Sequence, residues 1–205
     1  MTRPALPPLL PASFYARDAL EVARELVGTL LVKDGVVLRL TEVEAYRVGD
    51  SASHCRAGRT ARNAPMWGPP GHAYMYLCYG LHHMLNLVTD RDGVGSAVLV
   101  RSAEIIAGAE RVLVNRRWNK GLVPELLAGP GRVAQALALD GGFNHHPLFR
   151  RGGLELRAAP EPRPLAAGPR VGIDFAAPED RDAPWRIADA ASPWVTRRRG
   201  LHPLT

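Results

Sequence analysis

The sequence predicts a mixed α/β fold in one domain, on three observations. Short runs of β-branched and aromatic residues are separated by turn signals, which is typical of antiparallel strands. Other segments carry helix-capping and helix-stop signals. No repeat and no shift in composition marks a domain boundary along the 205 residues, a length that can bury a substantial core.

The first predicted element is a helix over residues 18–27. Asp18 is a suitable N-cap, Glu21 follows three residues later as in a capping box, and Gly28 is a stop signal. A β-hairpin is predicted next, because Asp34-Gly35 lies between the apolar runs 30–32 and 37–43.

The second strand of this hairpin continues into Glu42, Glu44 and Tyr46, which occupy every second position. In a strand this spacing places all three side chains on one face. Leu38 and Leu40 have the same parity, so we expect the acids on the face that begins as core. A buried acid is costly unless it has a partner or a function.

The middle of the chain combines a long loop with strands. Residues 47–70 lose periodicity and are rich in Gly, Ser, Arg and Asn, and long ordered loops tend to be functional. Tyr79 and Gly80 form a predicted turn from which an aromatic ring can project outward. The three strands predicted after the loop are residues 73–79, 83–89 and 94–100.

The last third is predicted to mix helices and short strands. Helices are expected at residues 104–115 and 132–139, and strands at residues 154–157, 170–175 and 185–187. The second helix is preceded by Gly129-Pro130-Gly131, which either leaves backbone amides free for an anion or is a plain turn into the helix.

Composition narrows the class of partner. The net charge is +6, and all but two of the 26 basic residues, Lys33 and Lys120, are arginines suited to bidentate phosphate contacts. An anionic partner such as nucleic acid is favoured, although a basic but indifferent surface is the alternative. Two cysteines, Cys55 and Cys78, are too few for a disulfide framework, so we expect a cytoplasmic protein. Residues 1–11 contain four prolines and no unbroken apolar run, and no stretch of 18 apolar residues occurs, so we expect no secretory segment and no membrane anchor.

Three clusters have both a chemical and a structural interpretation. The paired acids suit glycosidic cleavage by acid and base, or hydrogen bonding to a neighbouring strand. Histidines at 54, 72, 82 and 83 match no zinc signature, so pocket or structural roles are favoured over a metal. Tyrosines at 46, 74, 76 and 79 are core aromatics or, beside an acid in a basic protein, the walls of a base-stacking pocket.

The order and spacing of these motifs resemble the alkyladenine-type 3-methyladenine DNA glycosylases, from Phe14 to about Arg197. The matching motifs are Glu42-Val43-Glu44-Ala45-Tyr46, Ser53-His54, Arg59-Thr60-Ala61-Arg62-Asn63, Gly71-His72-Ala73-Tyr74, Tyr79-Gly80-Leu81-His82, Asn86, Val98-Leu99-Val100-Arg101-Ser102-Ala103-Glu104, Gly129-Pro130-Gly131-Arg132, Gly168-Pro169-Arg170-Val171-Gly172 and Ser192-Pro193-Trp194-Val195. The departures are Ala61 where a proline is usual, Arg132 where a lysine is usual, and a shorter loop from Tyr46 to His54 in comparison with some members.

The resemblance implies a single mixed α/β domain over residues 1–205, with a curved antiparallel sheet flanked by helices. It implies a monofunctional enzyme that flips a damaged purine out of duplex DNA and hydrolyses its N-glycosidic bond, without cofactor or metal. A monomer acting on double-stranded DNA is expected. The implied roles are water activation by Glu44 with Arg101 and the carbonyl near Val171, a base pocket of Tyr46, His54, Tyr76, Asn86 and Val171, intercalation by Tyr79, and backbone contacts by Arg62, Met66, Gly131, Arg132 and Arg170.

Two other functions compete with this one. A helix-hairpin-helix glycosylase would use residues 127–134 as its hairpin, but such a protein should be nearly all helix. A non-catalytic lesion-binding protein would use the same pocket and should lack the acid at position 44, which is present.

Overall fold

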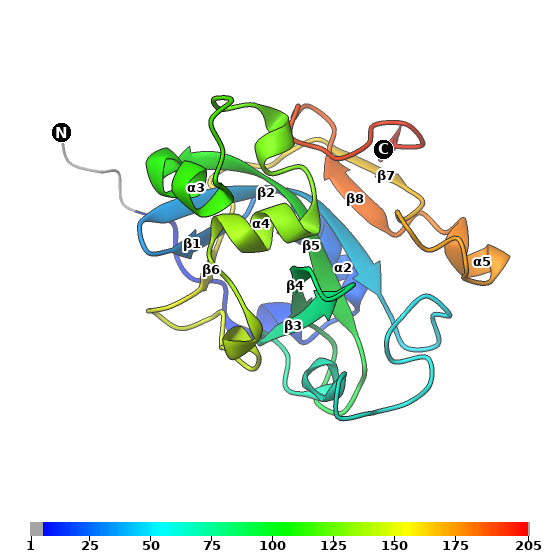
Figure 1. The fold of residues 1–205 in the computed structure, drawn as a ribbon. Coiled ribbons are helices and arrows are strands. Elements are labelled where there is room, and N and C mark those ends of the chain that lie inside the picture. Colours follow the sequence, from blue (N-terminus) through cyan, green and yellow to red (C-terminus); the bar gives the residue numbers. More distant parts are fainter. Residues whose placement is uncertain (1–5, 205) are drawn as a thin grey trace.

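The sheet is built outward from one hairpin in the computed structural model, which describes residues 6–204 (Figure 1). Strands β1 (Leu30–Lys33) and β2 (Val36–Tyr46) pair antiparallel, and Lys33 lies opposite Val36. Asp34 and Gly35 have φ angles of 48° and 83°, the left-handed conformation that a two-residue hairpin turn requires. The predicted hairpin is therefore confirmed.

Strand β2 is the central strand of an open antiparallel sheet. β5 follows one edge of β2, while β1 and then β8 occupy the other edge, and β1 also pairs with β6. The order across the sheet is β3 (Ala73–Cys78), β4 (His82–Val88), β5 (Ala97–Ala107), β2, β8 (Arg186–Asp189), β7 (Leu165–Gly168) and β9 (His202–Pro203), with β6 (Glu155–Arg157) beside β1.

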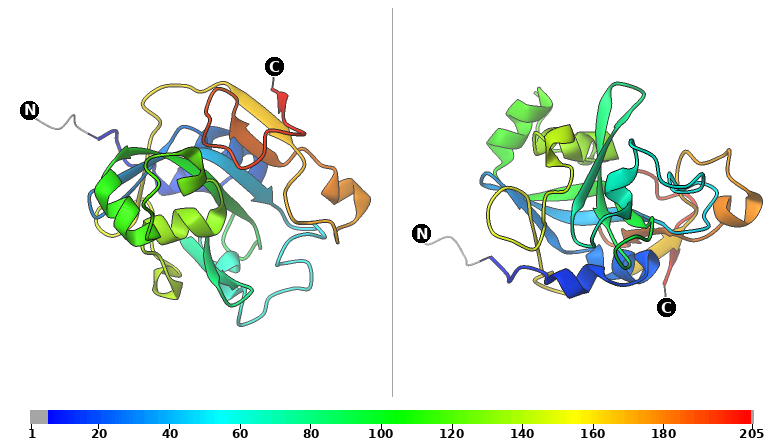
Figure 2. Two further views of the ribbon diagram at one scale, coloured as in Figure 1. Left: turned by 45° about the horizontal axis from the view of Figure 1, so that its top comes forward. Right: turned by 90° about the horizontal axis from the view of Figure 1, so that it is seen from below.

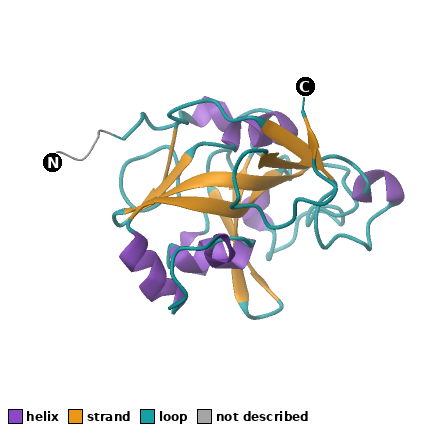
Figure 3. Cartoon of the chain, turned by 90° about the horizontal axis from the view of Figure 1, so that it is seen from above, coloured by secondary structure: helices purple, strands orange, loops and turns teal. Residues whose placement is uncertain are grey.

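Helices cover both sides of this sheet (Figure 3). Helix α2 (Ala19–Leu26) packs on β2 and β5, and Oδ1 of its cap Asp18 accepts a hydrogen bond from Leu20 N at 2.9 Å. Helix α4 (Pro130–Ala136) packs on β4 and β5, and α3 (Ala109–Arg116) packs on α4. The short helices are α1 (Ala12–Tyr15), α5 (Pro178–Arg181), η1 (Ala64–Trp67), η2 (Pro124–Leu126) and η3 (Gly141–Phe143). The fold is thus mixed α/β with a large antiparallel sheet, as predicted.

A double β-bulge interrupts the pairing of β2 with β5. Between Leu40 and Val43 the register shifts twice, so that Thr41 on β2 and Arg101 on β5 have no partner on the facing strand. A bulge adds a residue to the alternation of a strand and bends it locally. Arg101 is therefore the extra residue of β5 at this irregularity.

The bulge also changes which side of β2 faces the core. Leu38 and Leu40 before it, and Val43 and Ala45 after it, all pack in the main hydrophobic cluster. The expectation that the two glutamates of β2 share the face of Leu38 and Leu40 is therefore wrong. The extra residue reverses the alternation, so the acids leave the core face and project with Tyr46 from the other face.

Two predicted segments are wrong. The chain at 104–107 continues β5, where Glu104 pairs with Arg39 at 3.1 Å between Nη1 and Oε2, and helix α3 begins only after Gly108. Gly108 has a φ of 79°, and a Cβ there would lie 2.7 Å from the carbonyl oxygen of Gly35, so the chain turns at this point. Residues 170–175 form no strand, because the pairing partner of β8 is β7, which ends before Pro169.

The β3–β4 hairpin projects beyond the rest of the sheet (Figure 2). Cys78 lies opposite His82, and the three residues between them include Tyr79 at a φ of 50°. The strand predicted over 73–79 thus ends one residue earlier, the strand predicted over 83–89 is shifted by one residue, and the predicted turn at Tyr79 is confirmed. Across residues 6–204 no helix combines the length and apolar character needed to cross a membrane.

Candidate active site

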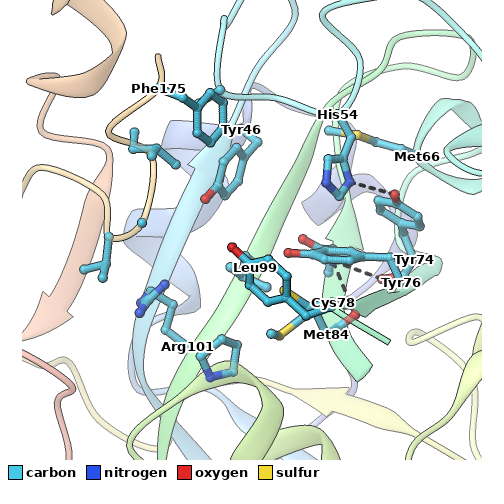
Figure 4. A pocket seen from close by; sticks show the side chains of 17 residues that line it. Tyr46, His54, Met66, Tyr74, Tyr76, Cys78, Met84, Leu99, Arg101 and Phe175 are labelled. Atoms are coloured by element: carbon cyan, nitrogen blue, oxygen red, sulfur yellow. Dashed lines mark hydrogen bonds between the residues drawn. The ribbon is translucent and has the colours of Figure 1, made fainter. Parts of the chain in front are cut away.

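A cavity of about 330 Å³ opens where the end of β2 meets β5, the β3–β4 hairpin and the chain at 171–175 (Figure 4). The ends of the central strands therefore deliver side chains to one space. Its aromatic lining consists of Tyr46, His54, Tyr74, Tyr76, Tyr79 and Phe175.

Glu44 lies directly behind the cavity wall and has no exposed surface. Its Oε1 accepts a hydrogen bond from Val171 N at 2.7 Å, and its Oε2 accepts from Tyr46 Oη at 3.0 Å and from Arg101 Nη1 at 3.1 Å. All three donors belong to residues that line the cavity. Because a carboxylate has about four acceptor sites, one remains on Oε1 for a further donor such as water.

Arg101 supplies a buried positive charge beside this carboxylate. Burial disfavours the cation, but Glu44 and Glu42 outweigh it and raise the pKa of the guanidinium. Arg101 Nε also lies 3.6 Å from Glu42 Oε1, so one arginine bridges both acids. A fixed cation here holds both carboxylates in place through charged hydrogen bonds and ion pairs.

Glu42 is equally buried but is fully occupied by structural bonds. Its oxygens accept hydrogen bonds from Arg186 Nη1 at 3.0 Å, Ser102 Oγ at 3.1 Å and Thr196 N at 2.7 Å. The hydroxyl of Thr196 adds a further donor at 2.8 Å. Glu42 therefore joins β2, β5, β8 and the C-terminal segment, which agrees with the structural interpretation for this acid.

The aromatic walls can enclose a flat ring. His54 Nδ1 lies 2.9 Å from Tyr74 Oη, and the His54 ring meets Tyr76 edge to face with centroids 4.5 Å apart. Tyr46 points into the cavity from the opposite side (Figure 4). Between these walls lies a slot with aromatic surfaces on two sides, which suits a base held by stacking.

The imidazole of His54 and the phenol of Tyr46, which line the slot, are both neutral. Burial, followed by the charges of Arg62 and Arg56, lowers the pKa of His54, so the imidazole is neutral at pH 7. Burial, followed by the charge of Glu44, raises the pKa of Tyr46 well above its usual value. The Tyr46 hydroxyl therefore keeps its proton and donates a hydrogen bond to the carboxylate.

Asn86 and Tyr79 complete the cavity at its inner and outer ends. Asn86 is buried on β4, and its Nδ2 donates to the Tyr74 carbonyl at 3.2 Å, which fixes the amide. Tyr79 is 94% exposed at the hairpin tip. A large aromatic with almost no protein contact is available to a partner.

The residues expected to contact the DNA backbone fall into two groups. Arg62 and Arg132 are exposed, and Gly131 is half-buried against His82. Met66 is buried, lines the cavity and gives its amide to Asn63 O at 2.9 Å. Arg170 is 5% exposed and forms an ion pair with Asp50. The side chains of Met66 and Arg170 are thus enclosed by protein, whereas those of Arg62 and Arg132 are open to solvent.

Sequence reasoning missed Phe175 and Asp50. Phe175 is 65% exposed at the cavity mouth, with the Arg56 guanidinium 5.3 Å from its ring centroid. The assignment of residues 170–175 to a strand hid it. Asp50 lies in a loop without periodicity, and nothing local indicates that its carboxylate is buried. Within residues 6–204 no group of three or more His, Cys, Asp or Glu side chains could hold a metal ion.

Comparisons with known proteins identify the family of this chain. A model of the methylpurine-DNA glycosylase family matches residues 13–193. A protein from Nitrosococcus oceani, provisionally named a 3-methyladenine DNA glycosylase, is 56% identical over 196 residues, which cover 95% of this chain and 96% of the relative. The Arabidopsis thaliana protein named DNA-3-methyladenine glycosylase is 52% identical over 198 residues, covering 96% of this chain and 78% of the relative. This chain belongs to the methylpurine-DNA glycosylase family.

Proposed function

We propose that this protein is a monofunctional DNA glycosylase of base excision repair. It flips an alkylated or deaminated purine from double-stranded DNA into the cavity and hydrolyses the N-glycosidic bond, leaving an abasic site. The observation that carries this proposal is Glu44, a buried carboxylate with one acceptor site left, at the wall of an aromatic slot.

Glu44 activates the attacking water as general base, and Arg101 holds the carboxylate by a hydrogen bond to Oε2. The sugar develops oxocarbenium character as the bond to the base breaks, and an adjacent negative charge stabilises it. The carbonyl near Val171 helps to hold the water. We expect a monomeric enzyme in the cytoplasm with the chromosome, without cofactor or metal.

The damaged base lies in the slot between Tyr46 on one side and His54 and Tyr76 on the other. Asn86 opposes the amino group of normal guanine, and Tyr79 fills the position that the base has left in the stack. Flipping costs a few kcal/mol and least for a weakly paired lesion, so the step itself selects damage. Arg62, Arg132 and the backbone at Gly131 hold phosphates.

A base-release assay tests the proposal. Duplexes with one 3-methyladenine, 7-methylguanine, hypoxanthine or ethenoadenine are incubated with the parent protein, and the freed base is measured. Glu44→Gln should abolish release and leave lesion affinity within about tenfold, since it removes the base but keeps size and hydrogen bonding. Glu104→Gln, on the same sheet but paired with Arg39, is the matched control and should stay active.

The two competing functions give other results. A helix-hairpin-helix glycosylase is excluded by the antiparallel sheet and the family match. A non-catalytic lesion-binding protein would bind the duplexes but release no base with the parent sequence. Substantial turnover by Glu44→Gln would instead move the catalytic role to another group.

A further inference from the structure

Arg170 is a buried cation that the proposed mechanism does not use. Its Nη1 and Nη2 bind the two oxygens of Asp50 at 2.5 and 2.9 Å, and Nη1 also donates to Ala45 O at 3.0 Å. Both side chains of the ion pair are fully buried. Bidentate pairing of this kind fixes the plane of the guanidinium as well as its place.

The guanidinium is also held between two aromatic rings. Its Cζ lies 4.6 Å from the centroid of Tyr46 and 4.9 Å from that of Trp185. Tyr46 lines the cavity whereas Arg170 does not, so Arg170 supports the ring from behind. Cation–π contacts gain strength when they are desolvated, as this one is.

Two of the three donors to Glu44 depend on this arrangement. Tyr46, whose hydroxyl bonds Oε2, is stacked on the guanidinium, and Val171, whose amide bonds Oε1, is the next residue in the chain. The chain here has no strand pairing of its own to fix that amide. The Arg170–Asp50 pair therefore supplies the anchor that regular structure does not.

We propose that Arg170, held by Asp50, is a positioning residue that sets the Glu44 carboxylate through Val171 and Tyr46. The inference rests on the proposed function. It replaces a phosphate contact by an internal role for this arginine. Hydrogen bonds to a carboxylate favour its charged form, so loosening two donors at once makes the general base easier to protonate and less well aimed.

Arg170→Lys and Asp50→Asn test this, with Arg157→Lys as matched control. Arg157 is also buried and paired with a carboxylate, Glu155, but lies on β6 away from the cavity. Single-turnover base release is measured as a function of pH, lesion-duplex affinity as a function of salt, and folding by thermal denaturation. Asp50→Asn keeps size and leaves Arg170 in place, so it asks the same question should Arg170→Lys fail to fold.

The expected result is a rate lower by roughly ten- to a hundredfold in both variants, since small misplacement of a reacting group has effects of this order. Affinity should stay within about threefold at constant salt slope, because no phosphate contact is lost. The acid limb of the rate–pH profile should move to higher pH, which a loss of stability alone would not produce. Arg157→Lys should behave as the parent.

Two results would overturn the role. Unchanged rate and unchanged acid limb would make the pair purely structural, whereas a salt slope smaller by about 0.9 would make Arg170 a phosphate ligand after all. A parent protein that releases no base would instead overturn the proposed function. The two failures are therefore distinguishable.

Discussion

Replacing Tyr79 by glycine should make the protein more stable than replacing it by alanine, and both changes should weaken binding of the lesion duplex. Tyr79 has a φ of 50°, in the left-handed region that costs a non-glycine residue about 1 to 2 kcal/mol. Its side chain is 94% exposed and so loses almost no packing when removed. Tyr79→Gly relieves the backbone cost, whereas Tyr79→Ala retains it.

The magnitudes follow from these two facts. Glycine gains about 1 to 2 kcal/mol in the turn and loses about 0.5 to 1 kcal/mol through the freer unfolded chain, so it should exceed alanine by about 0.5 to 1 kcal/mol. For a chain of this size that is a difference in Tm of about 1 to 4 °C. Both variants lose base stacking worth about 1 to 3 kcal/mol, which corresponds to roughly 5- to 150-fold weaker binding of lesion duplex.

Thermal denaturation and fluorescence anisotropy with a labelled lesion duplex measure the two effects separately. Val114→Ala, on α3 and 74% exposed, is the control for removing an exposed apolar side chain elsewhere. The reasoning is refuted if glycine and alanine give equal Tm values, or if both bind and cleave the duplex like the parent. The expected outcome would identify a strained residue retained for function.

Four further results are expected. Glu42→Gln should lower the free energy of unfolding in denaturant by about 3 to 5 kcal/mol, because it leaves buried guanidinium groups uncompensated; a loss under 1 kcal/mol would contradict this. The imidazole of His54 should titrate by NMR below its usual pKa of 6.5, and Arg62→Ala should raise that pKa. Log affinity for DNA should fall linearly with log salt, with a slope smaller by about 0.9 in Arg62→Ala, and a flat response would remove the basic surface from the mechanism. Activity should persist in EDTA without a borohydride-trapped adduct, since Lys33 is paired with its neighbour Asp34, Lys120 stacks on Trp118, and neither lines the cavity.

Local signals in the sequence were enough for the elements that local interactions determine. The Asp34-Gly35 turn, the Asp18 cap and the turn at Tyr79 each depend on a few adjacent residues, and each is found as predicted. The alternation of Glu44 and Tyr46 likewise sufficed to place them on one face, where they bond each other.

Features set by long-range pairing could not be predicted in the same way. Glu104 has good helix propensity, but Arg39 lies opposite it on β2 and the strand continues. Arg170 follows an apolar stretch and reads as a strand residue or as a surface cation, yet its ion-pair partner, Asp50, is 120 residues away. Tertiary context of this kind overrides propensity and is invisible in a single sequence.

The double bulge at Thr41 and Arg101 determines how the sheet would respond to the deletion of one residue from β2 or β5. Substitutions near it leave the path of β2 intact. Deleting Thr41 would give Val43 the same parity as Leu40, so Val43 and Ala45 would stay on the core face and the two glutamates on the other face. The extra residue of β5, Arg101, would then have no counterpart on β2. Such a deletion should therefore act first on the pairing of β2 with β5. A matching deletion at Arg101 would restore the pairing but remove the cation beside Glu44, so the length of both strands is bound to the chemistry they carry.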